Sequence, residues 1–190
     1  MSDRTKFPRI DAIAVAKELC DALRPHTDRL IVAGSLRRRK DMVGDVEILF
    51  IPKFQIVRDG LFDQTQASLA DHCLAMLITA GTLAPRKNIK GSITWGPKNK
   101  LALHIPSGIP VDFFATNEEA WFNYIVCRTG PAESNMAICN AAIAKGWKWN
   151  PYAAGFSRPQ GLGTQIYLVK SERDVFDFVG LPFREAWERT

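Results

Sequence analysis

The sequence predicts an α+β protein in two parts: a mixed sheet with flanking helices up to about residue 115, then a smaller α+β lobe. Strand-like and helix-like apolar patterns alternate through the first part, whereas helical patterns with short strand-like runs dominate the second. The chain has 190 residues, of which 46% are hydrophobic and 24% charged, so it is long enough and apolar enough for two small folded lobes.

In the first part, apolar residues at helical spacing predict helices over 10–24 and 69–80, the second closed by Gly81. Alternating or continuous apolar runs predict strands, which we place at 30–33 (a buried strand followed by a turn at Gly34-Ser35), 45–52, 88–95, 99–105 and 109–115.

In the second part, the pattern predicts a helix over about 117–127 and another opened by Gly130-Pro131, with Pro131 at the first helical position. Short strands are expected at 147–152 and 165–170. Ser171 with Asp174 is typical of a helix N-terminus, and the last helix should end near Gly180.

The chain is basic, with 25 Lys and Arg against 20 Asp and Glu and a net charge of +5. A modest positive charge by itself only favours solubility. Basic residues cluster, however, and such clusters suit a phosphate-rich partner; they lie at 37–40, at Arg86-Lys87 with Lys90, and at Lys98 with Lys100.

The four cysteines form no CxxC pair and have no His at zinc-finger spacing, so neither disulfides nor structural zinc is expected. The polar first residues lead into no apolar signal region, and no apolar run approaches the length of a membrane span. These features predict a soluble, cytoplasmic protein with no membrane partner.

Three acidic residues lie inside apolar strand patterns. Asp45 and Glu47 are two residues apart, so their side chains point to one face of the expected strand. Asp112 lies in another such strand. Carboxylates that converge from neighbouring strands repel one another unless cations neutralise them, and hard oxygen ligands suit Mg²⁺ or Mn²⁺. The alternative for the Asp45-Glu47 pair is the solvent face of an ordinary strand.

An anion-binding segment is expected just before this pair. A strand that runs into Gly34-Ser35 exposes backbone N–H groups and a hydroxyl, and the guanidinium groups of Arg37 and Arg38 follow. An anion holder beside a cation holder is what a metal-bound nucleoside triphosphate requires.

In this order, the segments 34–38, 43–47 and 111–112 resemble the nucleotidyltransferase palm of the X-family DNA polymerases. Thr129-Gly130-Pro131 with Asn135 is similar to that family's Thr-Gly turn and nucleotide-binding helix, and 176–189 is similar to its thumb. The resemblance implies a palm at 1–115 and a thumb-like domain at 116–190. It also implies the minimal palm-plus-thumb type, without a lyase step.

The resemblance implies a monomeric DNA-directed DNA polymerase that uses two Mg²⁺ ions, for which Mn²⁺ substitutes, to fill gaps in DNA repair. Its partners would be gapped or primer-template DNA and nucleoside triphosphates. The residues that match the family motifs receive these roles: metal ligands and catalytic carboxylates Asp45, Glu47 and Asp112, with Asp112 nearest the primer 3′-hydroxyl; triphosphate contacts Gly34, Ser35, Arg38 and Gly44; sugar and base contacts Thr129, Gly130 and Asn135.

Five residues depart from the family pattern. Glu47 stands where the polymerases usually have Asp, Pro110 replaces a usual Arg before the third carboxylate, and Cys139 replaces a helix Arg near the template. Cys127-Arg128 occupies the place of an aromatic pair that screens the sugar 2′-position, which predicts weak discrimination against ribonucleotides.

Two other functions remain open at this point. A nucleotidyltransferase that modifies an RNA end, a small molecule or a protein would share the triphosphate site, although the thumb-like lobe favours a polymerase. A catalytically idle DNA-binding module is the alternative of another class, and three intact carboxylates speak against it.

Overall fold

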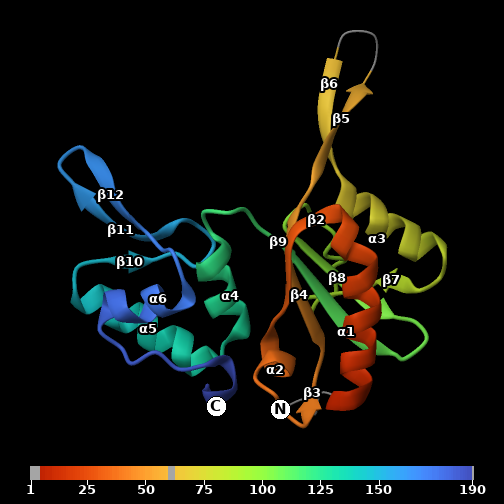
Figure 1. Ribbon diagram of the computed structural model, residues 1–190, viewed down its shortest axis with the longest axis horizontal. Coiled ribbons are helices and arrows are strands. Elements are labelled where there is room, and N and C mark those ends of the chain that lie inside the picture. Colours follow the sequence, from red (N-terminus) through yellow and green to blue (C-terminus); the bar gives the residue numbers. More distant parts are fainter. Residues whose placement is uncertain (1–4, 60–62, 190) are drawn as a thin grey trace. The chain divides into compact units, whose positions relative to one another are not determined.

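The computed structural model describes residues 5–59 and 63–189, and the chain forms two compact units (Figure 1). The first unit comprises Met1–Val32 and Asp41–Ala115; the second comprises Ala33–Lys40 and Thr116–Thr190. The predicted α+β class, a mixed sheet with helices followed by a smaller lobe, is confirmed.

The first unit is built on a five-stranded sheet. Its neighbouring strands are antiparallel except for the central pair β4 and β9, which run parallel. The strands lie in the order β2 (Thr27–Val32), β4 (Val46–Pro52), β9 (Ile109–Ala115), β8 (Asn99–His104) and β7 (Leu83–Pro85).

Helices α1 (Arg9–Leu23) and α3 (Leu69–Thr79) pack against this sheet (Figure 1). Of the apolar face that the spacing of α1 predicts, Ala16, Cys20 and Leu23 are buried and Ile13 is half-buried; Ala12, Val15 and Leu19 complete the buried stripe. Ser68 caps α3, since its hydroxyl accepts a hydrogen bond from the backbone N–H of Asp71 at 3.1 Å. Gly81, at φ 76°, follows the helix end as predicted.

Smaller elements complete the first unit. A 3₁₀ turn (Arg24–His26) follows α1, and β1 (Phe7–Pro8) pairs with β3 (Met42–Val43). The sequence patterns did not reveal the hairpin of β5 (Phe54–Asp59) and β6 (Asp63–Ser68), which projects from this unit's sheet (Figure 1). Its strands are rich in Gln and Asp and lack a clear apolar alternation.

Three expectations for the first 115 residues were wrong. The strand at 30–33 begins at Thr27, and its apolar side chains are only half-buried because β2 is the edge of the sheet. Gly34-Ser35 is the first turn of a short helix, α2 (Gly34–Arg37), rather than a simple turn. The segment 88–95 is not a strand, and in it only isolated bridges pair Lys87 with Ile93 and Trp95 with Lys100.

The second unit surrounds one apolar core with three helices and a small antiparallel sheet. The core includes Val126, Ile138, Trp149, Phe156, Val175 and Phe176. Its main elements are α4 (Trp121–Thr129), α5 (Ala132–Ala144), β10 (Lys148–Trp149), β11 (Gly155–Gln160), β12 (Gly163–Leu168) and α6 (Glu172–Val179), followed by a 3₁₀ turn at Ala186–Glu188.

Local chemistry explains the helix ends of the second unit. The Ser171 hydroxyl accepts a hydrogen bond from the Asp174 N–H at 3.0 Å, and Gly180 follows α6 in the left-handed conformation, both as predicted. The helix expected at 117–127 starts later, because the Asn117 side chain caps a turn at Ala120. Pro131 is the N-cap of α5 rather than its first helical residue.

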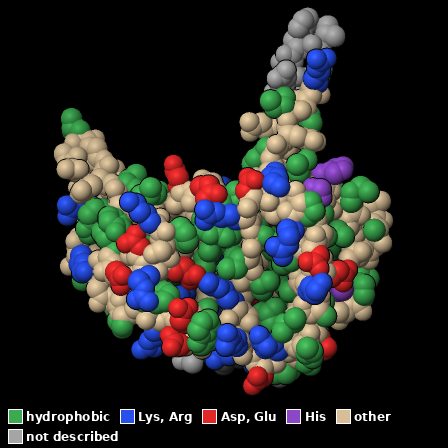
Figure 2. Space-filling model, in the orientation of Figure 1, with side chains coloured by type: hydrophobic (Ala, Val, Ile, Leu, Met, Phe, Trp, Pro, Cys, Tyr) green, Lys and Arg blue, Asp and Glu red, His purple; other side chains and the backbone are tan. Residues whose placement is uncertain are grey.

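Across residues 5–59 and 63–189, no helix is both long and apolar enough to cross a membrane. Figure 2 shows basic side chains on both units, interspersed with acidic ones on the face displayed.

Candidate active site

Two of the predicted site carboxylates are direct neighbours in the sheet of the first unit. Glu47 on β4 pairs with Asp112 on the parallel strand β9. Paired residues share a face, so both carboxylates project to the same side. The alternate residues Val46, Ile48, Val111 and Phe113 point to the other side and are at most 1% exposed.

Asp45 directly precedes β4 and lines a pocket with Asp112. The pocket has a volume of about 610 Å³ and is also lined by Gly44 and Arg86. Asp45, Glu47 and Asp112 are all partly buried rather than fully solvated. From the sequence, Asp45 and Glu47 were expected on one face of a single strand, but Asp45 lies just before β4, so their shared face stays a prediction. Glu47 and Asp112 come from neighbouring strands, as expected, while the metal and catalytic roles of all three acids stay predictions.

The structure adds Arg86 to this site. Its guanidinium forms an ion pair with the Asp112 carboxylate, and the two side chains are 28% and 15% exposed. Arg86 follows β7, and its backbone N–H donates to the carbonyl of Leu101 on β8 at 2.9 Å. Sequence reasoning counted Arg86 only as part of a basic cluster, because nothing local to residue 86 reveals that it stands opposite residues 101 and 112.

The donor set suits a hard divalent cation. Carboxylate oxygens are the ligands that Mg²⁺ and Mn²⁺ prefer, and two of the three acids are adjacent in register. Among the described residues, no three His, Cys, Asp or Glu side chains are already grouped closely enough to hold a metal ion. Arg86 supplies positive charge to Asp112.

A second charged cluster lies wholly within the second unit and joins α2, α4, α6 and the C-terminal segment. Arg37 donates to the Thr129 hydroxyl at 2.7 Å and to both carboxylate oxygens of Glu172 at 2.5 and 3.0 Å. Arg189 donates to the same carboxylate at 3.1 Å. We call Arg37, Thr129, Glu172 and Arg189 the arginine cluster.

Arg38 contacts the turn that follows α4. Its Nη1 donates to the backbone carbonyl of Thr129. Gly130 has φ 62°, and a Cβ there would lie 3.2 Å from Arg38 Nη1, so both backbone conformation and space favour glycine. Arg38, Thr129 and Gly130, which the sequence assigned to one nucleotide site, thus lie together in this unit.

The side chains of Thr129 and Asn135 already have partners within the protein. Thr129 is fully buried, and its hydroxyl meets Arg37. Asn135 Nδ2 donates to the carbonyl of Cys127 at 2.9 Å, which ties α5 to the end of α4, while its buried Oδ1 has no hydrogen-bond partner in the described part of the chain. The contacts of Thr129 and Asn135 with sugar and base stay predictions. Asn135 Oδ1 is an acceptor that no described residue uses.

Gly34 and Ser35 form the first turn of α2, where N–H groups lack acceptors within the helix. They belong to the second unit, whereas Gly44 and the three carboxylates belong to the first. Their predicted contacts with a triphosphate stay predictions.

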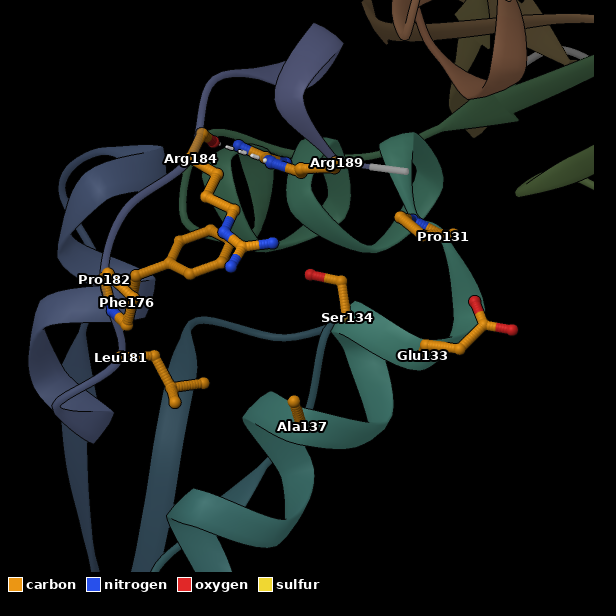
Figure 3. A pocket seen from close by; sticks show the side chains of 9 residues that line it. All are labelled: Pro131, Glu133, Ser134, Ala137, Phe176, Leu181, Pro182, Arg184 and Arg189. Carbon is orange, nitrogen blue, oxygen red and sulfur yellow. Dashed lines mark hydrogen bonds between the residues drawn. The ribbon is translucent and has the colours of Figure 1, made fainter.

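A pocket of about 280 Å³ opens beside the arginine cluster, between α5 and the C-terminal segment (Figure 3). The side chains of Arg184 and Ser134 point toward each other across it, and the Phe176 ring lies behind them (Figure 3). No local sequence pattern predicts this pocket, because its walls come from two distant segments, 131–137 and 176–189.

The basic clusters were expected to contact a phosphate-rich partner, but several of their side chains pair within the protein. Lys100 is buried and pairs with Asp71 at 2.9 Å, and the Arg39 guanidinium stacks 4.4 Å from the Trp187 ring. Arg37, Arg38 and Arg86 also have the internal partners described above. Exposed basic side chains in these segments remain at Arg39, Lys40, Lys87, Lys90 and Lys98.

Comparison with known proteins gives one family match and a set of structural matches. Residues 124–190 match the family described as DNA polymerase beta thumb. A crystal structure of Leishmania infantum polymerase beta in a ternary P/T complex is 19% identical, with a TM-score of 0.74 over 98% of this chain and 77% of that one. A ternary gap complex of the same polymerase is 18% identical, with a TM-score of 0.74 over 97% and 71%. A search of curated proteins gives no match.

Proposed function

We propose that this chain, a polymerase beta-like protein of the X family by its fold and its thumb, is a DNA polymerase that extends a primer 3′-hydroxyl and fills short gaps in DNA. The observation that carries the proposal is the pairing of Glu47 with Asp112 across parallel strands, with Asp45 two residues before Glu47. Carboxylate oxygens are the ligands that hard divalent cations prefer, and two of these carboxylates are adjacent in register, so this arrangement supports a metal site.

Asp45, Glu47 and Asp112 would hold two Mg²⁺ ions, for which Mn²⁺ substitutes. Bound ions would neutralise charge that develops on the phosphate and the attacking oxygen. Of the chain's own residues, Asp112 is assigned to the primer hydroxyl, whose proton a nearby carboxylate is suited to accept.

The second unit would bind the nucleotide. Ser35, Arg38 and the backbone at Gly34 are assigned to the triphosphate, together with Gly44 of the first unit. A guanidinium carries five N–H donors, so the bond from Arg38 to Thr129 is compatible with a phosphate contact. Thr129, Gly130 and Asn135 are assigned to the sugar and the base edge, with Asn135 Oδ1 available as an acceptor.

The thumb favours DNA as the acceptor over a small molecule or a protein. Residues 124–190 match a polymerase thumb, and one structure of similar fold is a ternary gap complex. Exposed Lys87, Lys90 and Lys98 lie in the same unit as the carboxylates and supply charge for a phosphate backbone.

The direct test is extension across a one-nucleotide gap with Mg²⁺ or Mn²⁺, beside RNA ends as the alternative acceptor. Incorporation of the templated nucleotide supports the proposal. The log of DNA affinity should also fall with log salt, with a slope of about −0.9 per phosphate neutralised. A flat salt dependence with transfer to RNA or to a small acceptor would instead favour a different nucleotidyltransferase.

A further inference from the structure

We propose that Arg86 is a positioning residue for Asp112. Its guanidinium holds the Asp112 carboxylate in place and competes with a divalent cation for that carboxylate. The inference rests on the proposed function only in taking Asp112 as a metal ligand. It assigns to this chain a counter-ion that comes from a different strand than the carboxylate.

Strand register explains why Arg86 meets Asp112. Leu101 on β8 pairs with Asp112 on β9, and the ladder between β7 and β8 continues one residue past Pro85 to place Arg86 opposite Leu101. Glu47, Asp112, Leu101 and Arg86 therefore stand in one row across four strands and on one face. Two strand spacings separate the backbones of Arg86 and Asp112 by roughly 10 Å. An extended arginine side chain spans that gap, and the ion pair shows that it does.

The row puts Asp112 between a like charge and an opposite charge. Glu47 lies beside it on β4 and Arg86 reaches it from the other side. Because the Asp112 side chain is only 15% exposed, water screens these charges weakly, and the guanidinium offsets part of the repulsion. A divalent cation on Asp112 would bind the same carboxylate and would meet the positive charge of Arg86.

The geometry indicates that the side chain of Arg86 orients Asp112 and contributes little to holding the fold. Its backbone is held by the bond to Leu101, which any residue at this position except proline would make. Its Nε is buried without a hydrogen-bond partner among the described residues, so the guanidinium contact with Asp112 is not part of a wider hydrogen-bonded frame. Pro110, two residues before Asp112 on the same strand, carries no side-chain donor.

The experiment measures Mn²⁺ binding by electron paramagnetic resonance, without DNA or nucleotide, for the whole chain and its Arg86→Gln variant. Removal of the competitor should tighten binding by about two- to tenfold, the range of a partly exposed ion pair. Arg86→Lys, which keeps the charge, should bind Mn²⁺ closer to the parent than to Arg86→Gln.

Lys87→Gln is the matched control, because Lys87 is exposed, lines the same pocket and carries the same charge. It should change Mn²⁺ affinity less than Arg86→Gln does. Equal effects of the two Gln variants, or unchanged or weaker binding in Arg86→Gln, would overturn the inference. If Arg86→Gln fails to fold by circular dichroism, the neutral variant Arg86→Met takes its place, and a tightening in Arg86→Met no larger than that of Lys87→Gln overturns the inference.

Failure of the proposed function has a different signature. If Arg86→Gln binds Mn²⁺ more tightly but the parent protein fills no gap, the role of Arg86 is supported and the proposed polymerase function is rejected. Conversely, if the parent fills gaps but Arg86→Gln binds Mn²⁺ with unchanged affinity, the polymerase function is supported and the positioning role of Arg86 is rejected. In an active enzyme, Arg86→Gln should lower both the metal concentration for half-maximal rate and kcat, since Asp112 loses its fixed orientation.

Discussion

The charged residues of the first unit and those of the second are brought together by different means. In the first unit, strand register alone places Glu47, Asp112 and Arg86 in one row. In the second, hydrogen bonds between distant segments assemble the arginine cluster. The row in the first unit follows from strand pairing, whereas the hydrogen bonds of the arginine cluster themselves hold segments of the second unit together.

The two groups also differ in charge balance. In the row, the Asp112 carboxylate forms an ion pair with one guanidinium and has Glu47 as its strand neighbour, whereas in the arginine cluster one carboxylate accepts hydrogen bonds from two arginines. We therefore expect neutralisation of an acid to remove chemistry from the first unit and stability from the second.

The largest effect is expected for Asp112→Asn. The loss of one metal ligand should reduce gap filling by about 10³-fold or more, on the order of 4 kcal/mol of transition-state stabilisation. The melting temperature should change less than for Glu172→Gln, because removal of the repulsion with Glu47 offsets part of the lost ion pair with Arg86. Primer extension and thermal melting measure the two quantities.

Asp71→Asn serves as the control for Asp112→Asn. Asp71 also pairs with a cation, Lys100, but lies on α3 and outside the row. It should keep near-parental extension; near-parental turnover in Asp112→Asn itself would remove the metal assignment.

Glu172→Gln should produce the opposite pattern. Arg37 and Arg189 would lose their shared counter-charge in a site where Glu172 is 17% exposed, which should cost about 2 kcal/mol and lower the melting temperature by roughly 5 °C or more. Thermal or urea unfolding checks this.

Asp21→Asn removes a pair of the opposite kind, since Lys17 and Asp21 are exposed neighbours on α1. It should have no measurable effect on stability. Equal destabilisation by Asp21→Asn and Glu172→Gln would mean that the arginine cluster is not a structural link.

Sugar discrimination is a smaller effect that tests the second unit alone. We expect less than about 10³-fold preference for dNTP over rNTP, because Cys127 is too short to act as a steric screen. Tyr152 lies beside it, with its hydroxyl 3.9 Å from Cys127 Sγ. Cys127→Tyr should raise the ratio of kcat/KM values by about tenfold. A parental ratio above 10³ would indicate that the Gly130 turn or Tyr152 closes the sugar pocket.

The smallest effect concerns the thiols. Burial raises the pKa of Cys20 to about 11, so almost none of this thiol is ionised near neutral pH. Cys20 should resist alkylation by iodoacetamide until the first unit unfolds, whereas the half-buried Cys127 and Cys139 should react earlier. Peptide mass spectrometry over a denaturant series measures this order, and early modification of Cys20 would show local opening of α1.

The sequence predicted the parts of the site that follow from local periodicity. Glu47 and Asp112 each lie in an apolar strand pattern, and both strands were predicted from sequence. That the two residues pair directly across parallel strands came from the structure. The caps at Ser171 and Gly180 are local for the same reason.

Positions fixed by long-range contacts were not accessible. The ion pair of Arg86 with Asp112 depends on the register of three strands, and the bonds from Arg37 to Glu172 join residues 135 apart along the chain. The hairpin of β5 and β6 was missed because its pairing is made by backbone hydrogen bonds rather than by apolar alternation. The strand predicted at 88–95 was wrong because its apolar residues suggested a strand, whereas only isolated bridges pair this segment with other residues.

The octapeptide Ala33–Lys40 belongs to the second unit, although the first unit surrounds it in the chain. No single cut therefore separates the two units with all their residues. A fragment that starts at Thr116 would lack Arg37 and Arg38 and would leave Glu172 to Arg189 alone. A faithful excised thumb would need this octapeptide grafted back, for example through a circular permutation, and a fragment made without it would understate the stability of the second unit.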